Sequence, residues 1–188
     1  MRNQYKVLSE KYQLVTEQTE QPVMVVDKEG NKRWYLNDKL HRTDGPAAEW
    51  ANGSKEWYLN GELHRTDGPA AEWANGIKYW YLNGKLHRTD GPAIEGANGP
   101  KEWYLNDKLH RTDGPAIERA NGIKEWYLNN KRHRTDGPAY EDPVDGYKAW
   151  YLNDVEYTKK EWKERLEMEQ GLKDLALIRT KYLNEKPI

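Results

Sequence analysis

The chain has 188 residues, which suffices for one domain or for one array of small repeats. Charged residues make up 32% of it, yet the formal net charge is −1, so neither nucleic-acid binding nor attraction to an anionic membrane is expected. It has no cysteine, no apolar run long enough to span a bilayer, and no apolar signal segment at its start. These features predict a cytoplasmic protein without disulfides or thiolate metal sites.

The first segment, residues 1–20, is predicted to be a helix. Its apolar residues Tyr5, Leu8, Tyr12 and Val15 recur at helical spacing. Beyond this segment the aromatic content is unusual, because the chain has nine Trp and thirteen Tyr but no Phe. Trp and Tyr combine an apolar body with a polar tip and suit half-buried surfaces, so a thin structure is expected.

Residues 22–153 are predicted to form an array of repeats. The heptapeptide HRTDGPA occurs five times at a constant spacing of 23 residues, and the block WYLN occurs six times. Identity at a fixed period is the mark of a repeat architecture. The heptapeptides contain every histidine of the chain and begin at His41, His64, His87, His110 and His133.

Each repeat is predicted to contain a β-hairpin, because Ala-Asn-Gly separates two strand-like runs. If Asn52 and Gly53 form a two-residue turn, Glu49 faces Glu56 across the hairpin. Alternation along the strands then assigns residues to two faces of the sheet. One face would carry Ala47, Glu49, Glu56 and Tyr58, and the other Ala48, Trp50, Lys55, Trp57 and Leu59.

A second, longer turn is predicted to join each repeat to the next. It begins at Asn60 and Gly61 and ends at Asp67 and Gly68, with Gly68 taking a positive φ. Pro69 then starts the next strand, where the missing N–H costs little. The first and last copies are one residue longer between Pro and Trp, which is typical of terminal repeats.

Residues 158–184 are predicted to form a C-terminal helical cap. Thr158 and Glu161 make a T-x-x-E capping box, and Trp162 follows them. Gly171 marks an expected break before a run of leucines. The two terminal helices are expected to cover the ends of the sheet or to pack on one of its faces.

The core WYLNGxLHRxDGPA, with one hairpin per 23 residues, resembles MORN repeats over about residues 22–153. The matching positions are Trp57, Asn60, Gly61, His64, Asp67 and Gly68, with their equivalents in the other copies. The chain departs from that family where Arg65 stands in place of a usual glycine and where Pro69 follows the second glycine. The resemblance implies a mainly β fold: a single-layer, elongated and twisted antiparallel sheet, here with N-terminal and C-terminal helices. Such sheets serve as scaffolds or interaction surfaces, some of them proposed to touch lipid.

A weaker similarity links KEWYLN to choline-binding cell-wall repeats. Those repeats have a shorter period and a downstream Gly-Trp pair that is absent here. This similarity leaves an aromatic carbohydrate or cell-wall binding module as an alternative to a scaffold.

Three interpretations of HRTDGPA can be compared. His64, Arg65 and Asp67 could act in catalysis, but identical copies spaced along a sheet do not assemble different groups in one pocket. Equivalent histidines about 10 Å apart, two strands along, cannot share a metal ion with bonds of about 2 Å. A structural role for His64, Arg65, Asp67 and Gly68 is favoured, and no catalytic residue, metal or cofactor is expected.

In that structural role Arg65 is expected on the face of Glu56 and Tyr58, and His64 opposite Trp57. Glu56 is replaced by Tyr79 and Ala149 in other copies, so the more constant partner of the arginine is the outer acid of each repeat. These acids are Glu49, Glu72, Glu95, Glu118 and Glu141. The resulting pairs are expected to set the register of the array.

Recognition is expected at positions where the repeats differ, because positions needed for folding are the ones that every unit retains. The residues predicted to contact a partner are Trp50, Lys55, Trp57, Trp73, Lys78, Trp80, Ile94 and Arg119. Packing of the terminal helices, or homodimerisation, is the alternative way to cover this patch. The sequence therefore predicts a non-enzymatic scaffold or module that binds a protein partner, with carbohydrate binding and lipid association as alternatives. Near-identical copies fit recent expansion in a bacterium, phage or large virus, where an inhibitor of a host protein or an antitoxin-like binder would be a natural role.

Overall fold

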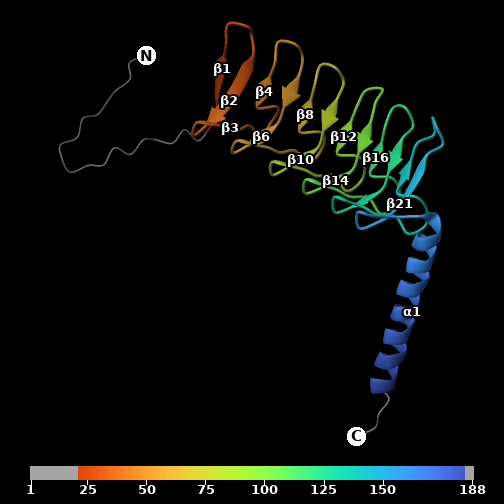
Figure 1. Cartoon of the computed structure of the whole chain (residues 1–188). Coiled ribbons are helices and arrows are strands. Elements are labelled where there is room, and N and C mark those ends of the chain that lie inside the picture. Colours follow the sequence, from red (N-terminus) through yellow and green to blue (C-terminus); the bar gives the residue numbers. More distant parts are fainter. Residues whose placement is uncertain (1–20, 185–188) are drawn as a thin grey trace, which may run out of the picture.

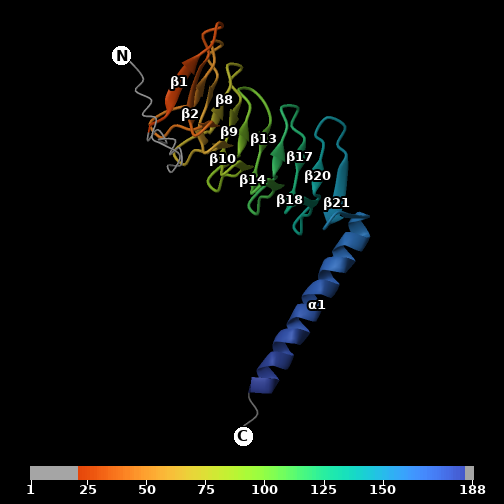
Figure 2. The ribbon, with the colours of Figure 1, turned by 90° about the vertical axis from the view of Figure 1, so that its left-hand side faces the viewer.

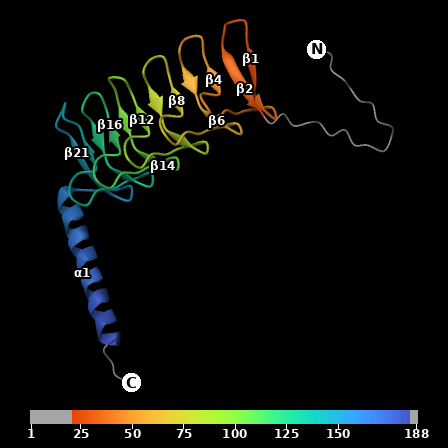
Figure 3. The same ribbon diagram turned by 180° about the vertical axis from the view of Figure 1, so that it is seen from behind.

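The computed structural model describes residues 21–184, and the helix predicted for residues 1–20 lies outside them. The described chain is a long antiparallel sheet of repeated hairpins followed by a helix at its C-terminal end (Figure 1). The hairpins stand side by side in chain order, so the array is elongated (Figures 1 and 3). The predicted mainly β fold with tandem 23-residue hairpins is confirmed.

The strands are short, and each internal repeat contributes four strands of two residues. In chain order they are β1 (Val23–Val26), β2 (Lys32–Leu36), β3 (Lys39–Leu40), β4 (Ala48–Glu49), β5 (Lys55–Glu56), β6 (Tyr58–Leu59), β7 (Glu62–Leu63), β8 (Ala71–Glu72), β9 (Lys78–Tyr79), β10 (Tyr81–Leu82), β11 (Lys85–Leu86), β12 (Ile94–Glu95), β13 (Lys101–Glu102), β14 (Tyr104–Leu105), β15 (Lys108–Leu109), β16 (Ile117–Glu118), β17 (Lys124–Glu125), β18 (Tyr127–Leu128), β19 (Lys131–Arg132), β20 (Tyr140–Glu141), β21 (Lys148–Leu152) and β22 (Val155–Tyr157).

The main sheet has fourteen strands, and all of its pairs are antiparallel. Its order is β1-β2-β4-β5-β8-β9-β12-β13-β16-β17-β20-β21-β22, with β3 branching from β2. Each strand of the row pairs first within its own hairpin and then with the next repeat. This order follows directly from the 23-residue period, because every unit repeats the same two connections.

The remaining strands form a second row of two-stranded hairpins, β6–β7, β10–β11, β14–β15 and β18–β19. Figures 1 and 2 show this row running beneath the main hairpins. Asn60 and Gly61 make the two-residue turn of the first of them, with φ of 52° and 87°. Both values are positive, as a type I′ turn requires. The prediction of a turn at Asn60 and Gly61 is confirmed.

The register of the main hairpins differs by one residue from the prediction. Ala48 pairs with Glu56 and Glu49 with Lys55, and the Trp50 N–H donates to the Ser54 carbonyl at 3.0 Å. The loop therefore has three residues, and Gly53 supplies its positive φ of 91°. A three-residue loop with Gly in the left-handed region is a common alternative to a two-residue turn. A shift of one residue changes which residues lie opposite each other across the hairpin and therefore which side chains share a face of the sheet.

The corrected register defines two faces of the array. The tyrosine face carries positions 48, 50, 54, 56, 58 and 63 of the repeat that begins at Pro46, together with their equivalents. The ladder face carries positions 49, 55, 57 and 65 and their equivalents. Cross-strand pairing joins 48 to 56, 49 to 55 and 58 to 63, and the Tyr58 hydroxyl reaches the Glu56 carboxylate at 3.2 Å.

The ladder face is named for an unbroken alternation of lysine and glutamate across the sheet. Lys32 pairs with Glu49, Glu49 with Lys55, and the alternation continues to the pair of Glu141 and Lys148. Opposite charges on directly paired residues contribute roughly 0.2–1 kcal/mol each. Any slip of one residue would replace these neighbours, so the ladder fixes the register.

The buried core is a line of small residues between the two rows of strands. Where the rows meet, the Trp57 N–H donates to the Ala70 carbonyl at 2.8 Å. The fully buried alanines at this position, each 0% exposed, are Ala47, Ala70, Ala93, Ala116 and Ala139. The expectation of a thin structure built on half-buried Trp and Tyr is consistent with this core.

Helix α1 (Lys159–Asn184) begins with the predicted capping box. The Thr158 N–H donates to the Glu161 carboxylate at 2.9 Å, and the Glu161 N–H donates back to the Thr158 hydroxyl at 3.3 Å. Trp162 is 7% exposed, and its indole N–H donates to the Arg134 carbonyl at 3.0 Å, which attaches the helix to the last repeat.

Beyond its first turns α1 projects away from the sheet (Figure 1). It passes through Gly171 without interruption, so the predicted break there is wrong. The helix covers only the end of the array and packs on neither face. Its exposed apolar side chains are Met168, Leu172, Leu175, Leu177 and Ile178.

Candidate interaction surface

The arginine of each HRTDGPA copy lies on the ladder face. The Arg65 guanidinium stacks over the Trp57 ring at 4.1 Å, and its Nε donates to the Asp67 carboxylate at 2.8 Å. Its Nη1 also donates to the Pro69 carbonyl at 3.2 Å and to the Glu72 carboxylate at 3.4 Å. The arginine does pair with an outer acid, but with Glu72 of the following repeat and not with Glu49 of its own, and its predicted place beside Glu56 and Tyr58 is wrong.

The same stack recurs along the array, with guanidinium-to-ring distances of 3.8–4.1 Å. Asp67 makes its bond to Arg65, which lowers the pKa of the Asp67 carboxyl through that hydrogen bond and through the positive charge. The arginine therefore joins the turn that follows it to the strand that precedes it.

The glycine of each copy is needed for space. Gly68 does not have the positive φ that the sequence suggested. A Cβ at this position would lie 2.9 Å from the guanidinium carbon of Arg65, closer than real Cβ contacts allow. The guanidinium is accordingly held between the Trp57 ring and the Gly68 backbone.

The histidine of each copy connects neighbouring repeats. The Nδ1 atom of His64 lies 2.8 Å from the Asn83 Oδ1 atom of the next repeat, and the Asn83 N–H donates to the same Nδ1 at 3.2 Å. The His64 N–H donates to the Trp57 carbonyl at 2.9 Å, which agrees with its predicted place opposite Trp57. The histidine, arginine and aspartate of the motif thus each have a partner within the fold.

No arrangement typical of a metal site or a membrane span occurs in the described chain. Within residues 21–184, no group of three or more His, Cys, Asp or Glu side chains is placed to hold a metal ion. In the same residues, no helix combines the length and the apolar character that crossing a bilayer requires.

Differences among the repeats are concentrated on the tyrosine face. On the ladder face, positions 49, 55 and 57 are Glu, Lys and Trp in all five repeats that begin at Pro46, Pro69, Pro92, Pro115 and Pro138. On the tyrosine face, only the tyrosine at position 58 is constant. Position 50 and its equivalents are Trp50, Trp73, Gly96, Arg119 and Asp142, and position 54 and its equivalents are Ser54, Ile77, Pro100, Ile123 and Tyr147.

The residues predicted to contact a partner are divided between the two faces. Trp50, Trp73, Ile94 and Arg119 lie on the tyrosine face, whereas Lys55, Trp57, Lys78 and Trp80 lie on the ladder face. The prediction that all of them share one surface is wrong, because it depended on the two-residue turn. The rings of Trp57 and Trp80 are also covered by the arginines that stack on them.

A cleft of about 400 Å³ opens on the tyrosine face between Trp50 and Trp73. Asn52, Ser54 and Glu56 also line it. Trp73 is 43% exposed, more than is usual for so large an apolar side chain.

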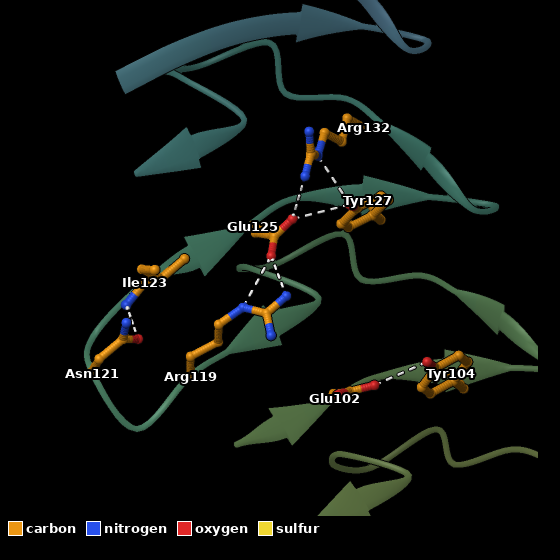
Figure 4. Close-up of polar contacts among 8 residues, drawn as sticks. All are labelled: Glu102, Tyr104, Arg119, Asn121, Ile123, Glu125, Tyr127 and Arg132. Carbon is orange, nitrogen blue, oxygen red and sulfur yellow. Dashed lines mark hydrogen bonds and ion pairs between the residues drawn. The ribbon is translucent and has the colours of Figure 1, made fainter. Parts of the chain in front are cut away.

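A buried carboxylate lies farther along the same face. Glu125 is 2% exposed and accepts hydrogen bonds from the Arg119 Nη2 and the Arg132 Nη2, each at 2.8 Å (Figure 4). The Tyr127 hydroxyl donates to it at 3.0 Å, and Arg132 Nε donates to that hydroxyl at 2.9 Å. In the neighbouring repeat, the one side-chain hydrogen bond that Glu102 accepts within the described chain comes from the Tyr104 hydroxyl, at 2.9 Å.

The pKa values on this face follow from burial and neighbouring charge. Burial alone would raise the pKa of Glu125, but the hydrogen bonds from Arg119, Arg132 and Tyr127 outweigh it and lower that pKa. Burial, together with the Glu56 carboxylate, raises the pKa of Tyr58 to about 12. Both groups therefore keep their usual charge states at neutral pH.

The sequence did not lead us to predict Ser54 and Glu56 as residues that line a cleft, nor the ion pair between Glu125 and Arg132. Two signals were available. Arg132 replaces the leucine of the three preceding repeats in the same copy in which Arg119 appears, so two new cations face one acid. The two-residue register placed Glu49 opposite Glu56, a pairing of like charges that the three-residue loop avoids.

The comparisons with known proteins add no family. No protein-family model matches the chain, and no curated protein matches it.

Proposed function

We propose that this chain is a non-enzymatic, MORN-like repeat scaffold that binds a protein partner through its tyrosine face. The observation that carries the proposal is the separation of constant and variable positions between the two faces. Residues that hold the repeats together lie on the ladder face, whereas the side chains that distinguish one repeat from another lie on the opposite face.

The composition of the tyrosine face supports the same proposal. It presents Trp50, Trp73 and Arg119 beside a row of half-buried tyrosines, and Trp, Tyr and Arg are the residues most enriched at the centres of protein interfaces. Its residues are held on paired strands, so little conformational entropy is lost on binding. The elongated row of repeats supplies a long surface for one partner.

The test uses a photo-crosslinking amino acid at two neighbouring positions on opposite faces. Ile94 lies on the tyrosine face and Lys101 on the ladder face, in strands that pair with each other. Position 94 tolerates an aromatic group, because Tyr140 occupies the equivalent site. In cells that make the protein, a crosslinked adduct to one protein is expected from position 94 and not from position 101. An adduct formed only at position 101, or none from position 94, would contradict the proposal.

A further inference from the structure

The cleft between Trp50 and Trp73 occurs once along the described array. The acid that lines it, Glu56, is followed at equivalent positions by Tyr79, Glu102, Glu125 and Ala149. Ser54 lies directly between Trp50 and Trp73 in the register of the sheet, and Glu56 follows it two residues later, directly between Ala48 and Ala71. Among these equivalent positions of the described array, only that of Glu56 has a tryptophan diagonally across the sheet on both sides. The corresponding neighbours of Glu102 are Gly96 and Arg119.

Glu56 is the one charged residue that lines this cleft. Its carboxylate accepts a hydrogen bond from the Tyr58 hydroxyl at 3.2 Å, and within residues 21–184 it forms no ion pair. Glu125, at the equivalent position three repeats beyond Glu56, is by contrast neutralised by two arginines. The cleft therefore holds an uncompensated negative charge between two aromatic walls, which is an environment suited to a cation.

The far sides of both walls are already occupied. Arg33, on β2, stacks on Trp50 at 4.7 Å, and its charge is balanced by Asp27 at 3.1 Å. Tyr79, on β9, packs on Trp73 with ring centroids 4.7 Å apart. These strands lie outside β4 and β8 in the sheet order, so the indoles are supported from behind while the space between them stays open.

The molecule itself shows which cation suits a tryptophan in this fold. Arg33 on Trp50, and Arg65 and its equivalents on the ladder-face tryptophans, all place a guanidinium over an indole. A guanidinium is planar and weakly hydrated, and it can stack on an aromatic face while donating hydrogen bonds to a carboxylate. A lysine ammonium lacks the planar shape.

We propose that the cleft between Trp50 and Trp73 binds an arginine side chain of the protein partner. The guanidinium lies between the two indoles and donates to the Glu56 carboxylate. This inference rests on the proposed function, since it names the group by which the partner engages the tyrosine face.

The test is a titration of the isotope-labelled full chain with the peptide acetyl-Gly-Arg-Gly-amide, followed by NMR of the indole N–H signals. Single Trp50→Phe and Trp73→Phe variants assign the two signals. We expect saturable shifts of both, and no shift with the same peptide carrying citrulline, which has nearly the shape of arginine without its charge. Equal shifts with the citrulline peptide, or none with the arginine peptide, would overturn the proposal.

Two matched variants make the test specific to the cleft. Glu56→Gln and Glu102→Gln each replace a carboxylate that accepts one tyrosine hydroxyl, so their effects on the fold are alike. Glu56→Gln is expected to weaken the affinity for the peptide about ten-fold, while Glu102→Gln leaves it unchanged. Equal weakening by both variants would refute the cleft as the site. A negative titration beside a positive crosslink at position 94 would reject the arginine site alone and leave partner binding by the face in place.

Discussion

The two faces of the array have the same backbone but different kinds of side-chain contact. On the ladder face the arginine of every HRTDGPA copy makes the same stack on a tryptophan and the same bond to the Asp of its turn, and the Lys–Glu pairing continues from repeat to repeat. On the tyrosine face the contacts differ from repeat to repeat, and Glu56, Glu102 and Glu125 have one, one and three side-chain residues as partners. Stability is thus expected to depend on the first face and recognition on the second.

Arg88→Ala, in a central repeat, is expected to have the largest effect. It removes the stack on Trp80 at 4.1 Å and the hydrogen bonds to Asp90 at 2.9 Å and to the Pro92 carbonyl at 3.1 Å. Allowing for the exposure of Asp90, the free energy of unfolding should fall by about 2–3 kcal/mol. Urea unfolding measures it, with Lys85→Ala on an exposed strand as the control. A loss no greater than that of the control would contradict the importance of the stack.

Gly91→Ala tests the space beside the same arginine. Its Cβ would lie 2.8 Å from the Arg88 guanidinium carbon, and the strain should cost about 2 kcal/mol. In an Arg88→Ala background the group that it would strike is gone, so the added cost should fall nearly to zero. The double-mutant cycle in urea measures this coupling. Simple additivity of the two changes would show that the glycine serves some other need.

Glu125→Gln tests whether the one acid of the tyrosine face that has three side-chain partners contributes to stability. Removal of this buried charge should lower the free energy of unfolding by about 2 kcal/mol at pH 7, because hydrogen bonds to charged groups contribute about that much. The folded pKa of Glu125 lies below its ordinary value of 4.5. Its contribution is therefore complete above the unfolded pKa and is lost as the pH falls through the folded pKa. The difference between wild type and variant should disappear in acid, and a constant difference down to pH 2 would be inconsistent with this account.

Glu56→Gln should have the smallest effect on stability. Glu56 is half-buried, and a glutamine can still accept the hydrogen bond from Tyr58. The free energy of unfolding should change by less than about 0.5 kcal/mol, although peptide binding is expected to weaken. A thermal unfolding curve measures the first quantity, and a large loss of stability would place Glu56 among the structural residues.

The repeated fold could be predicted because each repeat restates the same local signals. The 23-residue period, the turn at Asn60 and Gly61 and the capping box at Thr158 are all set by residues close in sequence. A turn signal that would be weak in a single copy becomes strong when it recurs five times at the same spacing.

The faces could not be predicted, because they depend on the length of one loop. Asn52 and Gly53 suit a two-residue turn as well as the three-residue loop that forms, and the choice moves Trp50 away from Lys55. The role of Gly68 was likewise hidden, since the guanidinium that fills its space reaches it only in the folded repeat. The continuity of α1 through Gly171 reflects the low cost of a single glycine, about 1 kcal/mol, in a long helix.

The identical HRTDGPA junctions have a consequence for how the gene can change. Recombination between two copies adds or removes 23 residues and leaves the lysine–glutamate alternation unbroken. Loss of residues 69–91 would bring Gly96 next to the repeat of Trp50 and abolish the cleft, whereas loss of residues 92–114 would keep both tryptophans adjacent. One genetic step can therefore remove the cleft or keep it while the repeated strand pairing is preserved.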